Sequence, residues 1–216
     1  MAKSADPRNL LQDQAYDRLK GLIQTGTYPP GTFLSERQLA SKLGMSKTPI
    51  KSALTRLDIE GFVAVSPQQG IVVREPSLQE IIDLFDIRVA LETFVVRRIA
   101  GKLTPDQISR LRQNVKDQAQ AAKAKDEVEI TRLDTEFHTI LCSILGNREI
   151  ERVMWHFRDK LHRVILRVMK QASGRMQTAL EEHAGIAEAV IRGKGELAAE
   201  RIVKHLEFGK QFLISR

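Results

Sequence analysis

The sequence contains a single cysteine and no long apolar segment, and each scarcity excludes a class of protein. Cys142 alone permits neither an intramolecular disulfide nor a zinc finger built from cysteines. The N-terminal segment lacks the apolar core of a signal peptide. No apolar run reaches the ~18 residues that a transmembrane helix needs. We therefore expect a cytoplasmic protein that has no membrane partner.

Internal repeats are also absent, so a repeat architecture is not expected. The 216 residues, 42% hydrophobic and 28% charged, have the composition of an ordinary globular protein and suffice for two modest domains. The net charge is +7. A basic segment favours a polyanionic partner, although a solvated basic face would look the same. Between Phe33 and Leu57 the only acid is Glu36, against Arg37, Lys42, Lys47, Lys51 and Arg56.

Capping and turn residues predict three helices and a hairpin in the first third of the chain. Ser35 and Gln38 have the spacing of a capping box, and Ser46 can cap the helix that follows the turn at Gly44. Residues 67–70 have the composition of a hairpin turn. The predicted elements are helices at about 12–25, 35–43 and 46–60 and strands at 62–65 and 71–73, in the order of a winged helix-turn-helix.

The spacing of four residues also fits the geometry of a helix-turn-helix. Ala40 is the small residue where the helices cross, Gly44 is the turn residue, and Ile50 and Ala53 anchor the second helix. The opposite side of that helix would present basic and hydroxyl side chains to a DNA major groove. A winged helix used for protein contacts is the alternative. The expected DNA contacts are Arg37, Ser46, Lys47, Thr48 and Lys51, with Gln69 and Gly70 at the wing tip.

Beyond Pro76 every predicted element is helical. Ser77 opens the first helix with a capping box, and Thr104 is followed by a proline at the first helical position. Residues 74–76 form the expected linker between a domain of residues 1–75 and one of residues 76–216. Helices are predicted to begin near residues 77, 104, 126, 147, 174 and 195, which makes the protein mainly α with an antiparallel six-helix bundle.

Four polar side chains of the second domain lie on otherwise apolar helical stripes. Asp134 and His138 are one turn apart, and His183 and His205 follow the apolar positions of the last two helices. Burial of these groups costs on the order of several kcal/mol unless they are paired. A shared divalent cation such as Zn²⁺, Ni²⁺, Mn²⁺ or Fe²⁺ would remove that cost. Four polar groups that are each satisfied separately are the competing explanation.

The N-terminal motifs resemble those of the GntR family of bacterial regulators. The matching segments are Tyr28–Gly31, Leu34–Ala40, Leu43–Lys51 and Leu54–Val63. In that family an arginine of the helix before the turn contacts DNA, and the resemblance gives this role to Arg37. Lys47 and Lys51 stand where the family usually has arginine. Because lysine cannot make the bidentate hydrogen bonds of arginine, we expect these two lysines to contact phosphates more than guanine bases.

The second domain resembles the helical FCD sensor domain of FadR-type GntR regulators. The resemblance rests on Arg88 with Leu91 and Glu92, on residues 134–138, and on the later His183 and His205. It implies that Asp134, His138, His183 and His205 bind a metal at the bundle centre, with a small organic acid beside it.

The same resemblance places Arg88 at the effector pocket. Arg163 and Arg167 are weaker candidates for binding the acid. An Arg88–Glu92 ion pair, four residues apart on one helix, explains Arg88 equally well without a ligand.

The expected function is that of a ligand-responsive transcription regulator, with repression favoured, that binds a palindromic DNA operator as a homodimer. A small carboxylate would be sensed at the metal site. The alternative is a metal-dependent enzyme on a helical bundle with an accessory DNA-binding domain. The sequence lacks the paired Glu-x-x-His motifs, the His-Glu-x-x-His motif, the nucleophile elbow and the phosphate-binding glycine loop of such enzymes.

Overall fold

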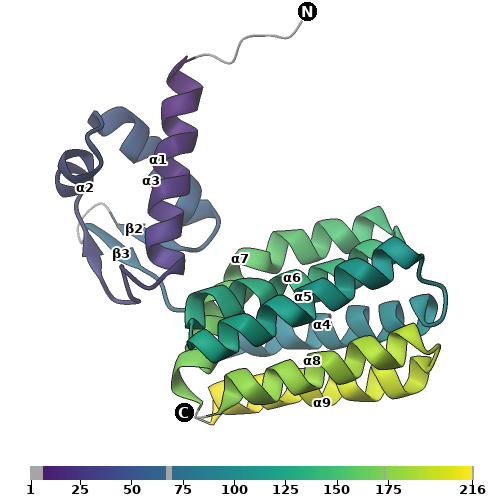
Figure 1. Ribbon diagram of the computed structural model, residues 1–216. Helices are drawn as coiled ribbons and strands as arrows, with labels where there is room; N and C mark the ends of the chain where they lie inside the picture. The colour runs from purple at the N-terminus through teal and green to yellow at the C-terminus, as the bar shows by residue number, and fades with distance from the viewer. Residues whose placement is uncertain (1–6, 67–69, 173, 216) are drawn as a thin grey trace, which may run out of the picture. The chain divides into compact units, whose positions relative to one another are not determined.

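The computed structural model describes residues 7–66, 70–172 and 174–215. The chain forms two compact units, and the boundary between them falls between Glu75 and Pro76 (Figure 1). Among the described residues, no helix combines the length and the apolar character needed to cross a bilayer.

The first unit packs three helices against a small antiparallel sheet. The strand order is β1-β3-β2, and Leu34 of β1 lies opposite Ile71 of β3. The core is apolar, with Leu19, Ile50 and Leu57 almost fully buried. This arrangement confirms the winged helix-turn-helix. Its elements are α1 (Pro7–Gln24), β1 (Phe33–Leu34), α2 (Glu36–Leu43), α3 (Lys47–Ile59), β2 (Val63–Ser66) and β3 (Gly70–Val73).

Three details of the first unit differ from the sequence expectations. Helix α1 begins at Pro7, five residues earlier than the apolar spacing indicated. Strand β1 was not predicted, because two residues are too short to show an alternation and become a strand only by pairing with β3. The capping box at Ser35 does not form, and its side chain makes no cap hydrogen bond. Ser35 follows directly on β1 and has the extended backbone of that strand.

In its described residues, the second unit is a bundle of six helices, as the sequence predicts. Helix α4 packs along α9 and against α6, while α5 packs against α6 and α8 (Figure 1). The capping boxes at Ser77 and Thr104 both form, because each hydroxyl accepts the backbone N–H three residues later. The helices are α4 (Leu78–Ile99), α5 (Pro105–Ala124), α6 (Glu127–Leu145), α7 (Arg148–Gln171), α8 (Arg175–Ile191) and α9 (Gly195–Ile214).

Candidate functional site

The side chains expected to contact DNA lie on the exposed faces of α2 and α3. Gly44 ends α2 with a φ of 65°, the left-handed conformation that a tight turn needs and that glycine adopts without strain. At the wing, Gly70 is exposed, whereas Gln69 lies outside the described residues. The exposed residues of the two helices include Arg37, Ser46, Lys47, Thr48 and Lys51.

Basic residues of this segment divide into those with structural partners and those without. The Lys42 ammonium lies 4.8 Å from the centre of the Tyr28 ring. Arg56 makes ion pairs with Asp13 and Glu60. Within the described part of the chain, Arg37, Lys47 and Lys51 have no acidic or aromatic partner. The cations left available to a polyanion are therefore the three that the sequence singled out.

The N-terminus of α3 is open to a ligand. Ser46 precedes the helix in an extended conformation but makes no side-chain cap hydrogen bond, so the expected cap is absent. Its hydroxyl and the first-turn N–H groups of α3 are left to bind an anion, a role that helix N-termini favour through their dipole.

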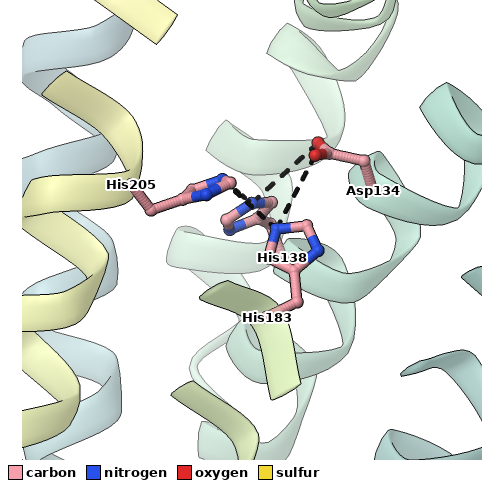
Figure 2. Close-up of side chains that lie close together, drawn as sticks. All are labelled: Asp134, His138, His183 and His205. Atoms are coloured by element: carbon pink, nitrogen blue, oxygen red, sulfur yellow. Dashed lines mark hydrogen bonds and ion pairs between the residues drawn. The ribbon is translucent and has the colours of Figure 1, made fainter. Parts of the chain in front are cut away.

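Asp134, His138, His183 and His205 meet inside the bundle (Figure 2). Helix α6 supplies the first two, and α8 and α9 supply one each. All four are at most 4% exposed, and one ligand atom from each lies within 4.8 Å of the others. The Nε2 atom of His205 is 3.3 Å from that of His138 and 3.2 Å from that of His183, and the Asp134 carboxylate is 3.6 Å from His183 Nε2.

A chain of hydrogen bonds fixes the tautomer of His183. The Asn114 amide donates to the backbone oxygen of Leu133 at 3.1 Å, so Asn114 Oδ1 faces the Gln118 amide, which donates to it at 2.7 Å. Gln118 therefore turns its Oε1 to His183 Nδ1 at 2.7 Å. Because that oxygen only accepts, Nδ1 carries the proton and Nε2 presents a lone pair to the cluster.

The other two histidines are oriented by carboxylates. His138 Nδ1 lies 2.5 Å from Glu92, and His205 Nδ1 lies 2.7 Å from Glu182. Each glutamate is in turn paired with a buried arginine: Arg88 Nε lies 2.7 Å from Glu92, and Arg175 lies 2.8 Å from Glu182. His138 therefore donates through Nδ1 and turns a lone pair on Nε2 toward the centre. His205 Nδ1 lies between the Glu182 carboxylate, which accepts, and Arg175 Nη2, which donates and is 3.1 Å away. The shorter contact, to Glu182, favours a proton on Nδ1 of His205 and a lone pair on its Nε2.

Three converging lone pairs and a buried carboxylate are an arrangement that suits a cation. A hydrogen bond between two Nε2 atoms needs a proton on one of them, whereas each neutral imidazole carries its single proton on Nδ1. Asp134 Oδ2 is buried and has no hydrogen-bond partner among the described residues. Two nitrogens bound at ~2.1 Å to one tetrahedral cation are ~3.4 Å apart, close to the separations seen here. The residues therefore fit a divalent metal.

The ionisation of the cluster suits coordination. Burial lowers the pKa of His138, His183 and His205 well below the ordinary value of 6.5, with further lowering by neighbouring arginines and imidazoles. The imidazoles are therefore neutral near pH 7, as metal ligands must be. Burial raises the pKa of Asp134 to about 6, against the opposing effect of Arg88 and Arg175.

Comparisons with known proteins agree with both halves of this description. The family model described as "Bacterial regulatory proteins, gntR family" matches residues 11–73, and that of the FCD domain matches residues 83–208. This chain belongs to the GntR family of bacterial regulators. Its second unit is an FCD domain.

Relatives of known sequence are named as transcription regulators rather than enzymes. The chain is 27% identical to the uncharacterized HTH-type regulator YdhC of Bacillus subtilis, over 89% of this chain and 86% of that protein. It is 26% identical to the HTH-type transcriptional repressor RspR of Escherichia coli, over 94% of this chain and 88% of that protein. The protein is therefore a DNA-binding transcription regulator, and the enzyme alternative falls.

A solved structure shows the same fold. The GntR transcriptional regulator of Rhodococcus sp. RHA1 superposes with a TM-score of 0.83 at 22% identity, covering 94% of this chain and 97% of that one.

A small cavity adjoins the histidine cluster of the FCD domain. Its volume is about 20 Å³, enough for about one water molecule. Arg88, Arg175, Asp134 and His205 supply its polar lining, and apolar residues of α4, α7 and α9 complete it. Among the described residues, Arg88 makes its one hydrogen bond through Nε, so its terminal nitrogens are left for the cavity.

The structure separates the arginines that the sequence grouped together. Arg88 both lines the cavity and forms the ion pair with Glu92 that the i,i+4 spacing allowed. Arg163 and Arg167, on α7, are half-buried, have partners within the chain, and are not among the residues that line the cavity.

Sequence reasoning missed four residues that shape the site: Gln118, Asn114, Glu182 and Arg175. A signal existed for two of them, because Asn114 and Gln118 interrupt the apolar stripe that Leu111 and Ala121 define on α5. Arg175, only 4% exposed, stands at the start of α8 after Gly174 and has no periodic pattern around it. Glu182 is one residue from His183 and is recognisable only through its contact with α9.

Proposed function

We propose that this regulator senses a small organic acid at a divalent metal held in its FCD domain, and that the acid alters binding to a palindromic DNA operator. The observation that carries the proposal is the set of three Nε2 lone pairs that face a buried carboxylate. A buried arrangement of this kind is strongly unfavourable without a cation.

Asp134, His138, His183 and His205 would hold the metal, and Glu92, Gln118 and Glu182 would orient the imidazoles. When bound, the cation supplies a Lewis-acidic centre that prefers oxygen and nitrogen ligands, so Zn²⁺, Ni²⁺, Mn²⁺ and Fe²⁺ all suit it. The neutral imidazoles and the carboxylate account for all four protein ligands, which leaves coordination positions for an oxygen of the acid.

The acid would bind in the cavity beside the cluster. Arg88 offers its terminal nitrogens there, and Arg175 Nη1 is buried without a hydrogen bond of good geometry, although it approaches Glu182. Guanidinium groups are preferred partners of carboxylates. Arg163 is the secondary candidate, and it requires a shift of α7 to reach the acid.

Binding of an acid would change the packing of the bundle. The cavity holds about one water, so an acid larger than formate must displace the helices that line it. One of them, α4, directly follows the linker to the winged unit. A dimer would present two recognition helices to two half-sites, and a shift of α4 would alter how the two wings engage them. Repression is the favoured mode, as the name of the Escherichia coli relative says of that protein.

The proposal is tested by operator release. An operator selected from random DNA is bound by metal-loaded protein, and a panel of small mono-, di- and tricarboxylates is titrated into the complex. We expect at least one acid to change the operator affinity by about 10-fold or more, a coupling typical of allosteric regulators.

The control is the same titration with the Arg88→Lys variant and with chelator-treated protein. Both should bind the operator but respond weakly to the acid. If the acid acts equally on metal-loaded and metal-free protein, the metal has no part in sensing and the proposal is wrong.

A further inference from the structure

One face of α4 is exposed along its whole length and has an unusual order of side chains. Asp83 stands near its N-terminal end, Ile87, Ala90 and Phe94 follow in the middle, and Arg98 stands near its C-terminal end. Spacings of three and four residues place all five on one stripe. Ile87 is 37% exposed and Phe94 48%, so the middle of the stripe is an apolar surface in contact with solvent.

This stripe is complementary to itself when turned end to end. In an antiparallel pair of α4 helices with a two-fold axis between Ala90 and Leu91, Asp83 lies opposite the partner's Arg98. Ile87 lies opposite the partner's Phe94, and the small Ala90 stands where the helices cross. Asp83 and Arg98 are ~22 Å apart along the helix, so the two charge pairs flank the apolar centre. Such an isologous contact is the one that a two-fold dimer requires.

The remaining charges near the stripe are already paired within the chain. Asp86 is bonded to Lys210 at 2.6 Å, and Arg97 is bonded to Glu196 at 3.0 Å, both on α9. In contrast, Arg98 has no acidic partner in the described part of the chain, and Asp83 accepts only an amide hydrogen bond from Gln79. Asp83 and Arg98 are therefore the charged side chains of this stripe that are available to pair with a second copy of the chain.

We propose that the exposed stripe of α4 is the surface at which two copies of this chain associate, in antiparallel register. This inference rests on the proposed dimeric binding of the operator and names the surface that makes the dimer. Its centre is formed by the exposed Ile87, Ala90 and Phe94.

Charge reversal tests both the surface and the register. In the Asp83→Arg dimer two pairs of positive charges face each other, and in the Arg98→Asp dimer two pairs of negative charges do. Each variant alone should therefore dimerise about 100-fold more weakly. When the two variants are mixed, the mixed dimer regains both opposite-charge pairs. Sedimentation and native mass spectrometry of the full-length protein should therefore show monomers for each variant alone and heterodimers for the mixture.

Helix α5 supplies matched controls. Asp117 accepts a 2.7 Å hydrogen bond from Gln113, the same arrangement as Asp83 with Gln79, and Arg112 is exposed as Arg98 is. Asp117→Arg and Arg112→Asp should leave the dimer intact. Phe94→Asp is a second disrupting variant, which should also give monomers with unchanged helicity and metal content.

Each outcome decides something different. A monomeric wild type would overturn the dimer and with it the proposed mode of operator binding. A dimeric wild type whose Asp83→Arg, Arg98→Asp and Phe94→Asp variants also stay dimeric would overturn the α4 surface and leave the proposed function intact. Monomeric variants that fail to pair on mixing would overturn the antiparallel register.

Discussion

The two candidate sites of this protein are built in opposite ways. On the winged unit, Arg37, Lys47 and Lys51 are exposed, and their side chains have no partner among the described residues. In the FCD domain, every imidazole of the cluster is buried and held by a second side chain that is itself held. The first site can lose a side chain without disturbing its neighbours, whereas the second loses its arrangement when one member is removed.

This difference matches what each site is proposed to recognise. A DNA backbone presents many phosphates at regular spacing, and flexible cations on a rigid helix suit it. A metal ion requires ligand atoms placed to within a few tenths of an ångström, which only locked side chains provide. The comparison predicts large, non-additive effects in the FCD domain and small, separable ones on the winged unit.

The largest effect is expected when two ligands are removed together. His183→Ala with His205→Ala should lower the bound metal from about one ion per chain to background, because a carboxylate and one imidazole bind divalent metals weakly. Elemental analysis of the purified protein measures this. His156→Ala, which changes an exposed histidine of α7, is the control. Full metal retention in the double variant would exclude the proposed site.

Acid should release the metal through Asp134 rather than through the histidines. Burial raises the pKa of Asp134 to about 6, so below that pH the metal must displace a proton, whereas the histidine pKa values lie well below 6.5. Metal affinity should therefore be level between pH 7 and 8 and fall about tenfold per pH unit below pH 6. Competition with a coloured chelator follows it, and Asp134→Asn should flatten the slope. If metal release began at pH 7 and were coupled to the uptake of two or three protons by the protein, the histidines would titrate first and this order would be wrong.

A smaller effect is expected on the winged unit. Lys51→Ala should weaken operator binding and reduce the slope of log affinity against log salt by about 1, because one phosphate contact is lost. Since the Lys51 side chain has no partner in the described residues, thermal stability should not change. Lys42→Ala removes a lysine that lies over the Tyr28 ring and should leave the salt slope unaltered. Identical slopes for all three proteins would mean that Lys51 does not touch DNA.

The smallest effect separates two serines that precede helices. The Ser77 hydroxyl accepts the Glu80 N–H, whereas the Ser46 side chain makes no cap hydrogen bond. Ser77→Ala should lower the free energy of unfolding by ~1 kcal/mol, and Ser46→Ala should change it by less than ~0.5 kcal/mol while weakening DNA binding. Denaturant unfolding followed by circular dichroism, together with operator titration, distinguishes them. Equal losses of stability would show that Ser46 caps α3 in solution.

Helices that begin with a capping residue followed by an apolar stripe were predictable from the sequence. Ser77, Thr104 and Asp126 begin helices in the places where a capping residue precedes an apolar stripe, and Gly146 ends one as expected. Strand β1 was not predictable, because its two residues are extended only through pairing with residues almost 40 positions later. The capping box predicted at Ser35 was wrong for the same reason, because the strand that precedes Ser35 holds its backbone in an extended conformation.

The ligand residues of the candidate site were predictable, but the residues that orient them were not. Asp134 and the three histidines stand out because polar groups on apolar stripes are rare. Glu182 and Arg175 reveal their role only through contacts with His205 on another helix. A sequence shows which side chains are buried more readily than it shows which of them touch.

Native mass spectrometry of the purified full-length protein tests the central idea most directly. If the four buried side chains coordinate a cation, each chain should carry the mass of one divalent metal ion, and chelation should remove it. A chain that stays metal-free after incubation with Zn²⁺, Ni²⁺, Mn²⁺ and Fe²⁺ in turn would contradict the account.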